Sequence, residues 1–153
     1  MYDVVLITTG RNAVRKIVED NVKQFYVIDC VNGKDVVLNE LENCIKNGVE
    51  KLFTYRCPYI IPKELYSKVK VGAYNIHPSL LPKYPGLNPW TEIIKNKTRE
   101  LGVTIHHMVV TPDAGEIIYQ EKFEILNQDT IEIARKKSDI VASNLLKKIL
   151  KFI

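Results

Sequence analysis

Short apolar runs that alternate with helix-like stretches are the feature that most constrains the fold of this chain. Residues 4–8, 25–29, 51–55 and 71–76 are short and rich in β-branched, aromatic or other apolar residues, as buried strands are. Strands that are separated in this way by helices need a parallel sheet with helices packed on its faces. The first half of the chain therefore predicts an α/β fold.

The segments between these strands carry the start and stop signals of helices. A turn over residues 9–12 leads into a helix that ends at about residue 20. Residues 37–47 have apolar residues at helical spacing and are followed by Gly48, a stop signal. Pro62 is a favoured first position and predicts a short helix after it.

The second half of the chain predicts a different arrangement. The prolines in residues 78–89 exclude regular structure and predict an ordered loop, and a helix should follow over residues 90–97. Residues 101–110 and 116–125 are β-like and are separated by a short turn. We therefore predict an antiparallel pair near the carboxyl-terminal end of a mostly parallel sheet.

A last helix is predicted after residue 129. Asp129 with Glu132 three residues later resembles a capping arrangement. Its apolar stripe is predicted to comprise Ile133, Ile140, Val141, Leu145 and Ile149. The length of 153 residues predicts one domain over residues 1–153.

Composition limits the class of protein. The chain is 46% hydrophobic and 26% charged, as soluble globular proteins are. Its start lacks a basic leader, and the apolar runs are shorter than the roughly 18 residues of a membrane helix. The three cysteines lack the spacing of a zinc ribbon or a disulfide framework. We expect a cytoplasmic protein with reduced, mostly buried thiols and no membrane partner.

The net charge of +4 is mild, and its basic residues concentrate late in the chain. They are Arg135, Lys136, Lys137, Lys147, Lys148 and Lys151. Such a cluster can attract a nucleic acid or an anionic metabolite. It is equally typical of the solvated face of an amphipathic helix, and the sequence leaves both interpretations open.

Asn75 and His77 stand two residues apart at the end of a predicted buried strand, so their side chains face the same way. An amide can donate to a developing oxyanion and an imidazole can carry a proton. Asp113, in the turn Thr111-Pro112-Asp113-Ala114-Gly115, supplies one carboxylate that could join them. These groups suit acyl transfer, although a histidine at a strand end is often structural and Asp113 also suits a turn.

His106 and His107 invite a zinc interpretation with His77 and Asp113. Adjacent strand residues point to opposite faces, so both histidines cannot bind one metal. We therefore expect no metal site.

The run Asn75-Ile76-His77-Pro78-Ser79-Leu80-Leu81-Pro82-Lys83-Tyr84-Pro85-Gly86 resembles the signature of the folate-dependent formyltransferases. This superfamily includes glycinamide ribonucleotide, methionyl-tRNA and sugar N-formyltransferases. Further matches lie in residues 101–106 and 113–118. The resemblance covers residues 50–125 and implies a Rossmann-like formyltransferase fold, here with a compressed amino-terminal half because only one helix fits between Asp29 and Lys51.

The resemblance assigns a catalytic trio to Asn75, His77 and Asp113. It implies that an amine attacks the formyl carbonyl of N10-formyltetrahydrofolate. Asn75 would donate to the oxyanion, and His77 would stabilise it or protonate the leaving nitrogen. Asp113 would hold His77 in its charged form and help to deprotonate the amine. His106 would lie behind Asp113, and His107 would be structural.

The resemblance also implies binding residues. The loop after the third strand, with Arg56, Pro58 and Tyr59, and the segment before Asp113, with Val110 and Thr111, would bind the folate. The acceptor would contact the turn after the first strand and the proline-rich loop. The residues implied are Thr9, Gly10, Arg11, Asn12, Pro78 and Lys83. Both segments could equally be ordinary strand-to-helix connections.

The branch of the family is less well defined. The residues of the proline-rich loop most resemble the glycinamide ribonucleotide branch. The acidic residue that this branch places on its late helix to meet the substrate has no clear counterpart here, where Ser138-Asp139-Ile140 stands instead. Residues 59–62 and 87–90 are more similar to amino-sugar formyltransferases. The chain ends at Ile153 without the extra domain of tRNA-directed members, so nucleic acid is disfavoured as a partner.

We therefore expect a formyltransferase acting on a primary amine of a small metabolite, preferably a nucleotide-linked amino sugar. Activity on glycinamide ribonucleotide is the close alternative. A formyltetrahydrofolate hydrolase and a degenerate folate-binding domain also fit the sequence, and a homodimer is compatible with it.

Overall fold

The computed structural model describes residues 1–86 and 89–152, and within them six strands form one sheet. The strands are β1 (Tyr2–Thr8), β2 (Phe25–Asp29), β3 (Val49–Tyr55), β4 (Gly72–His77), β5 (Glu100–His107) and β6 (Ile117–Glu124). Their order across the sheet is β2-β1-β3-β4-β5-β6. The chain starts near one edge, moves to the centre and finishes at the other edge.

The sheet is mixed, as predicted. β1 pairs in parallel with β2 and β3, and β3 pairs in parallel with β4. β5 is antiparallel to both β4 and β6. The predicted α/β architecture with an antiparallel pair near the end of the chain is therefore confirmed. The carboxyl ends of β1, β3 and β4 meet at one edge of the sheet, where open α/β sheets bind ligands.

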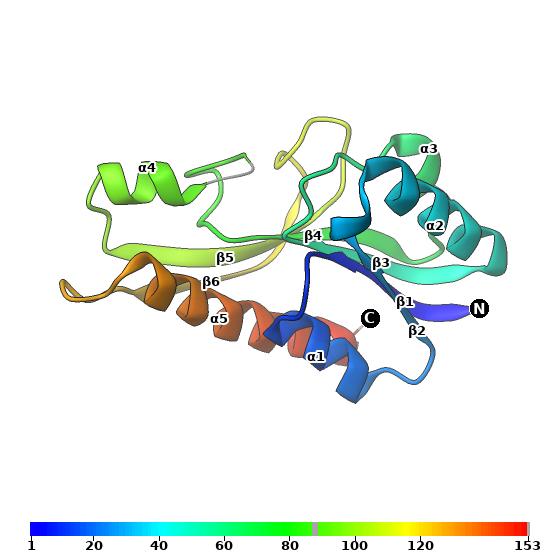
Figure 1. Ribbon diagram of the computed structural model, residues 1–153, viewed down its shortest axis with the longest axis horizontal. Helices are drawn as coiled ribbons and strands as arrows, with labels where there is room; N and C mark the ends of the chain where they lie inside the picture. Colours follow the sequence, from blue (N-terminus) through cyan, green and yellow to red (C-terminus); the bar gives the residue numbers. More distant parts are fainter. Residues whose placement is uncertain (87–88, 153) are drawn as a thin grey trace.

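Helices cover both faces of the sheet (Figure 1). α1 (Ala13–Asn21) and α5 (Ile131–Phe152) lie against one face, and α2 (Lys34–Asn47), α3 (Lys63–Tyr66) and α4 (Pro89–Lys95) lie on the other. A short 3₁₀ turn, η1 (Cys30–Asn32), precedes α2. One helix and one short turn thus connect β2 to β3, as the compressed amino-terminal half predicts.

The strands divide their side chains between two cores. On β1, Val4 and Leu6 pack with α1 and α5, whereas Val5 and Ile7 pack under α2. The same alternation continues along β3, with Leu52 on the α2 side and Phe53 on the α5 side. A strand that is buried on both faces has a nearly continuous run of apolar residues. Such runs are the reason these strands could be predicted from the sequence.

The start of α5 differs from the prediction. Thr130 accepts a hydrogen bond from the Ile133 backbone N–H at 3.2 Å, so Thr130 is the capping residue. Asp129 instead accepts from the Leu126 N–H at 2.8 Å and from Lys137 Nζ at 2.6 Å. The side chain of Asp129 therefore closes the preceding turn.

The apolar stripe of α5 was partly mispredicted. Ile133 and Ile140 are 40% and 59% exposed. They are seven residues apart and so share one line along the helix, beside the packed face. That face consists of Ala134, Ser138, Ala142, Leu145, Leu146 and Ile149. It includes small and polar residues, which a search for large apolar side chains overlooks.

Three element ends were placed inaccurately. α2 begins at Lys34, earlier than predicted, because Gly33 with a φ of 95° precedes the helix and its first two residues, Lys34 and Asp35, are exposed and charged. α4 ends at Lys95, and Lys97 follows with a φ of 50°. β5 ends at His107 because Val109 and Val110 leave the sheet and are exposed. Leu87 and Asn88 of the predicted loop lie outside the described residues.

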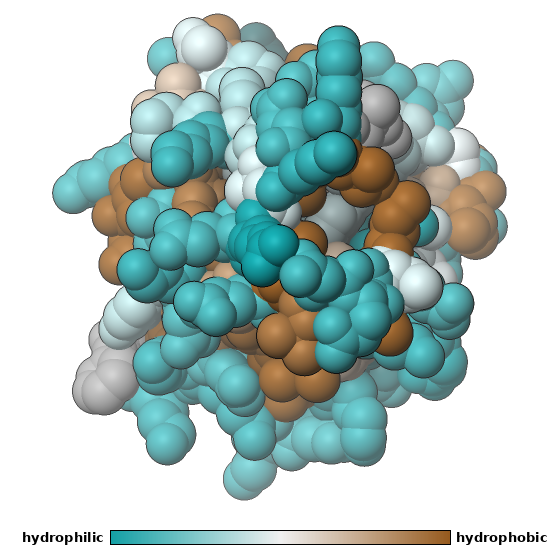
Figure 2. All heavy atoms as spheres, turned by 90° about the vertical axis from the view of Figure 1, so that its left-hand side faces the viewer, coloured by the Kyte–Doolittle hydropathy of each residue, from teal (hydrophilic) through white to brown (hydrophobic). Residues whose placement is uncertain are grey.

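Surface properties follow from this packing. In the described part of the chain, every helix is too short or too polar to cross a membrane. Cys30 and Cys44 are buried, Cys57 is half-buried, and all three are free thiols. Figure 2 shows that the end of the molecule carrying α4 is mainly hydrophilic, with separate apolar groups between the polar side chains.

Candidate active site

Polar side chains from three neighbouring strands share one face of the sheet near the edge where the parallel strands end. Thr54 on β3 stands opposite Asn75 on β4, and Asn75 stands opposite His106 on β5. His77 lies two residues beyond Asn75 and therefore on the same face. A register shift between Ile105 and His106 marks a bulge beside the site. Such bulges re-aim side chains next to active sites.

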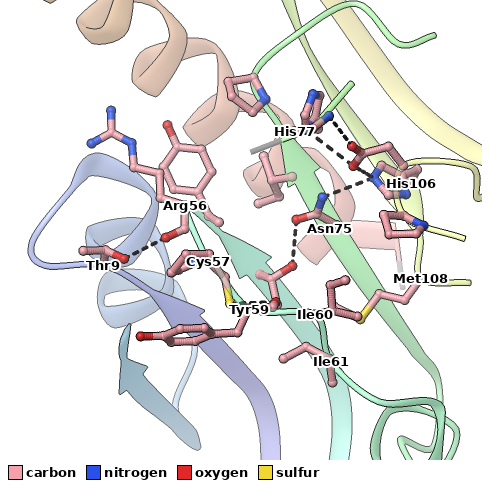
Figure 3. Close-up of a pocket in the computed structure, with 18 of the residues that line it drawn as sticks. Thr9, Arg56, Cys57, Tyr59, Ile60, Ile61, Asn75, His77, His106 and Met108 are labelled. Atoms are coloured by element: carbon pink, nitrogen blue, oxygen red, sulfur yellow. Dashed lines mark hydrogen bonds and ion pairs between the residues drawn. The ribbon is translucent and has the colours of Figure 1, made fainter. Parts of the chain in front are cut away.

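Hydrogen bonds hold the Asn75 amide in one orientation (Figure 3). The Thr54 hydroxyl donates to Asn75 Oδ1 at 2.7 Å, and Asn75 Nδ2 lies 3.2 Å from His106 Nε2. The other ring nitrogen of His106, Nδ1, lies 2.9 Å from the His107 carbonyl oxygen. That oxygen can only accept, so in neutral His106 the proton is on Nδ1 and Nε2 accepts from Asn75. Within residues 1–86 and 89–152 the other hydrogen of the amide has no partner and can bind a ligand.

His77 is buried and held at both ring nitrogens. Its side chain is 4% exposed. Nε2 lies 2.9 Å from the Tyr84 carbonyl oxygen and so carries the proton in the neutral ring. Nδ1 lies 3.5 Å from Asp113 Oδ1. A proton on Nδ1 would therefore face a carboxylate.

The pKa of His77 nevertheless lies below its ordinary value. Burial lowers it, while the Tyr84 carbonyl and the Asp113 carboxylate raise it to a smaller extent and His106 lowers it further. This direction does not support the expectation that Asp113 keeps His77 charged, because desolvation outweighs the attraction of the carboxylate. Near neutral pH the ring is neutral and can accept a proton at Nδ1.

The Asp113 carboxylate lies between the two imidazoles. Oδ1 is 3.5 Å from His77 Nδ1 and 3.6 Å from His106 Nε2, and Oδ2 accepts from the Gly86 N–H at 2.7 Å. Burial raises the pKa of Asp113, but the contact with His106 Nε2 at 3.6 Å, the hydrogen bond from the Gly86 N–H and the nearby His77 bring the pKa below its ordinary value. Asp113 is therefore ionised at neutral pH.

Backbone geometry brings this carboxylate to the histidines. Asp113 has a φ of 60°, a left-handed conformation that aspartate tolerates. Two residues later the chain passes so close to β5 that a Cβ on Gly115 would lie 1.7 Å from the His107 oxygen. Only glycine permits this approach. The predicted meeting of Asn75, His77 and Asp113 is what the coordinates show, with His106 beside them.

A cavity of about 770 Å³ opens over these side chains. One part of it is mainly apolar, and Figure 3 shows Ile60, Ile61 and Met108 gathered there. Its wall also includes Tyr66, Val109 and Pro112. An apolar wall beside a few oriented polar groups suits a flat heteroaromatic ring.

Only some of the residues predicted to bind folate line the cavity. Arg56, Pro58 and Tyr59 line the cavity. Val110 and Thr111 do not line it, and Val110 is 69% exposed. Their neighbours Val109 and Pro112 take those places, because β5 ends at His107 and the chain then turns.

The other part of the cavity reaches over the sheet edge to α5. Arg135 and Ser138 line it. Asp139, next to Ser138, bonds to the Tyr55 hydroxyl and to Arg56 Nη2, the latter at 2.9 Å. Burial first, and then the Asp139 carboxylate, raise the pKa of Tyr55 well above its usual range. These bonds connect the carboxyl end of β3 to α5.

The turn after β1 contributes little to the cavity. Of the four residues predicted there, only Thr9 lines it; Gly10, Arg11 and Asn12 do not. Asn12 Oδ1 caps α1 by accepting from the Arg15 N–H at 2.9 Å. The Gly10 N–H donates to Asp29 Oδ1 at 3.2 Å. Two of the backbone N–H groups that could have held a phosphate there, those of Gly10 and Arg15, are thus already paired within the protein.

The two residues of the proline-rich loop that were predicted to bind the acceptor lie in different places. Pro78 lines the main cavity, whereas Lys83 borders a separate depression with Gln120 and Lys122. Several lining residues were not predicted from the sequence: Thr54, Tyr55, Cys57, Trp90, Met108, Arg135 and Ser138. Thr54 could have been found from strand register, whereas the basic cluster that contains Arg135 and the segment that contains Ser138 did not show that α5 brings these two residues to the cavity.

The chain is similar to known formyltransferases. The family model described as Formyl transferase matches residues 34–150. A methionyl-tRNA formyltransferase of Staphylococcus aureus strain JH1 is 36% identical over 111 residues, 72% of this chain and 36% of that protein. The chain thus spans about a third of that relative's length.

Two solved structures have a similar fold. The phosphoribosylglycinamide formyltransferase of Streptococcus pneumoniae TIGR4 superposes with a TM-score of 0.81 at 18% identity, over 99% of this chain and 98% of that one. The formyltransferase PseJ of Anoxybacillus kamchatkensis, in complex with UDP-4,6-dideoxy-4-formamido-L-AltNAc and tetrahydrofolate, has a TM-score of 0.74 at 24% identity, over 97% and 75%.

Proposed function

This chain belongs to the formyl transferase family, and from that premise we propose that it moves a formyl group from N10-formyltetrahydrofolate to a primary amine of a small metabolite. The observation that carries the proposal is the meeting of Asn75, His77 and Asp113 at the floor of one cavity. An oriented amide, a neutral imidazole and an ionised carboxylate are the groups that acyl transfer to an amine needs.

The cavity fits the proposed donor. Its volume of about 770 Å³ lies in the range of ligand pockets, about 300–1,000 Å³. Ile60, Ile61 and Met108 would contact the pterin, and Pro58 and Tyr59 would border it. When bound, the donor supplies an activated formyl carbonyl.

Asn75 is the proposed donor to the oxygen that gains negative charge during acyl transfer. Thr54 and His106 hold its amide so that one N–H remains unused. A donor that is already oriented loses no reorganisation energy when the charge develops. Thr54 and His106 are accordingly positioning residues.

His77 and Asp113 are proposed to handle the protons. Neutral His77 can accept a proton at Nδ1, and the Asp113 carboxylate 3.5 Å away stabilises the resulting imidazolium. An amine must lose a proton as it is acylated, and the departing nitrogen must gain one. The buried pair can move a proton between these two places.

For the acceptor we favour a nucleotide-linked amino sugar. The likeness to PseJ, whose complex contains a UDP-linked formamido sugar, supports this class. The paired groups in the turn after β1 count against an acceptor whose phosphate would bind in that turn. Glycinamide ribonucleotide remains the alternative acceptor.

The test is a formylation assay with N10-formyltetrahydrofolate and four conditions: a UDP-linked 4-amino sugar, glycinamide ribonucleotide, charged methionyl-tRNA and no amine. Mass spectrometry detects the formylated product, and chromatography detects tetrahydrofolate. We expect formylation of the amino sugar. Tetrahydrofolate release at the same rate without any amine would instead indicate a hydrolase. Folate binding without turnover in every condition would indicate a binding domain.

A further inference from the structure

In the part of the cavity nearest α5, one arginine has no ion-pair partner among the described residues. Two arginines line the cavity, Arg56 and Arg135. Arg56 is bonded to Asp139 at 2.9 Å. Arg135 is exposed, and within residues 1–86 and 89–152 no carboxylate lies in ion-pair range of it. Its neighbours Lys136 and Lys137 pair with Glu132 and Asp129.

A hydroxyl without a partner accompanies this arginine. Ser138 is 1% exposed, lines the cavity, and its Oγ has no hydrogen-bond partner among the described residues. Only the Arg15 Nε shares this condition there. Buried polar groups are normally hydrogen-bonded. Arg135 and Ser138 are three residues apart and therefore neighbours on the helix surface, so one ligand group can bind both.

The charged groups near Arg135 and Ser138 allow an anion to bind there. Asp139 is the nearest carboxylate in sequence, and Tyr55 and Arg56 already bond to it. In the turn after β1, by contrast, the Asp29 carboxylate accepts from Gly10 and Val31 and lies 3.7 Å from Arg15. A second anion in that turn would meet Asp29 and be repelled.

We propose that Arg135, with Ser138, binds a phosphate-type anion on the acceptor amine, so that α5 rather than the turn after β1 selects the acceptor. This inference rests on the proposed function, because it assigns a ligand to the acceptor side of the same cavity. The chemical class is an amine carrying a phosphate or a diphosphate. The apolar part of the cavity remains available to the folate.

The direct test needs no catalysis. Isothermal titration calorimetry measures the binding of inorganic phosphate and inorganic pyrophosphate to the wild-type protein and to Arg135→Gln, Arg135→Lys and Lys136→Gln. Loss of a charge-assisted contact should weaken binding about 10- to 100-fold in Arg135→Gln. Arg135→Lys should restore part of it, and Lys136→Gln should bind as the wild type does. Tighter binding of pyrophosphate than of phosphate would indicate a diphosphate-linked acceptor.

The Ser138→Ala variant tests whether the Ser138 hydroxyl contacts the ligand or has only a structural role. A ligand contact predicts weaker pyrophosphate binding with unchanged urea stability. A structural role predicts unchanged binding. If Ser138→Ala binds as the wild type does, Ser138 is removed from the site.

Kinetics then test selection of the acceptor. For the amine that the wild type formylates, Arg135→Gln should raise KM about 10- to 100-fold with little change in kcat. The matched amine without its phosphate should show the raised KM in both proteins. Equal pyrophosphate binding by wild type and Arg135→Gln would overturn the inference, even if formylation is observed. Arg135-dependent binding without formylation would uphold the anion site and reject the proposed transfer.

Discussion

Two strand ends at the same edge of the sheet carry polar residues. They differ in how many of the hydrogen-bonding groups of these residues already have a partner within the protein. In the turn after β1, Gly10 donates to Asp29 and Asn12 caps α1. At the end of β4, by contrast, Asn75 has one amide hydrogen with no partner among the described residues, and His77 presents Nδ1 to Asp113. A polar residue at a strand end becomes a candidate for chemistry only when the fold leaves part of its bonding capacity unused.

The largest predicted effect comes from removing the polar groups at the end of β4. Asn75→Ala should lower kcat on the order of 10²–10³-fold, as loss of an oxyanion donor does. His77→Ala should lower it about 10²–10⁴-fold, because the proton carrier is lost. Steady-state formylation kinetics measure both. Lys83→Ala, on the loop that follows β4 and outside the cavity, is the control and should retain wild-type kcat. Near-wild-type turnover by His77→Ala contradicts the mechanism.

The second prediction concerns the close approach that brings Asp113 to the histidines. Gly115→Ala places a Cβ 1.7 Å from the His107 oxygen, so the backbone must move. Overpacking of this kind costs roughly 1–3 kcal/mol, or more. Urea unfolding should show that loss, and kcat should fall because the carboxylate moves with the turn.

Ala114→Ser, at the exposed neighbouring position, is the control and should change neither quantity. If Gly115→Ala unfolds at the wild-type urea midpoint, the turn is more adaptable than the structure indicates.

A third prediction uses the lowered pKa of His77. The unfolded state binds a proton near pH 6.5, whereas folded His77 binds it only at a lower pH. The resulting stability is fully present above pH 6.5 and is lost as the pH falls through the folded pKa. Each pKa unit of depression corresponds to about 1.4 kcal/mol.

Urea unfolding between pH 7 and pH 5 measures this effect. The wild type should lose more stability over this range than His77→Gln, which has no titrating ring. The pKa of Asp113 lies below its ordinary value of 3.8, so its titration falls outside the window. Parallel curves for the two proteins would show that burial does not depress the pKa of His77.

The smallest predicted effect tests the turn after β1. Asp29→Ala removes a carboxylate whose pKa is lowered chiefly by the Val31 N–H bond, with Gly10 and Arg15 contributing. Loss of such a local cap costs about 1 kcal/mol, and kcat should stay within about twofold of wild type. Thermal unfolding and the formylation assay measure the two quantities. A large loss of kcat would mean that this turn takes part in the chemistry after all.

Some parts of the site could be predicted from the sequence because they depend on local geometry. Asn75 and His77 share a face because side chains in a strand alternate. His106 and His107 face opposite ways for the same reason: His106 contacts Asn75, and His107 lies against the Tyr74 ring. Gly48, with a φ of 94°, ends α2 as predicted.

Other parts could not be predicted because they depend on which segments meet. Val110 looked like a continuation of β5 but lies outside the cavity, because the chain turns after His107. Asp129 looked like a cap, although Thr130 is the residue that bonds to the first turn of α5. Both errors arise where two neighbouring residues offer the same chemistry and only the backbone path decides between them.

The amino-acid sequence alone determined the alternation of strands and helices and the pairing of an amide with an imidazole at the end of β4, because hydrophobic periodicity and side-chain alternation act over a few residues. Only the tertiary structure decided that Asp29 satisfies the turn after β1, that burial keeps His77 neutral, and that α5 brings Arg135 and Ser138 to the cavity. Those outcomes depend on desolvation and on contacts between distant segments. Neither is encoded in the spacing of neighbouring residues.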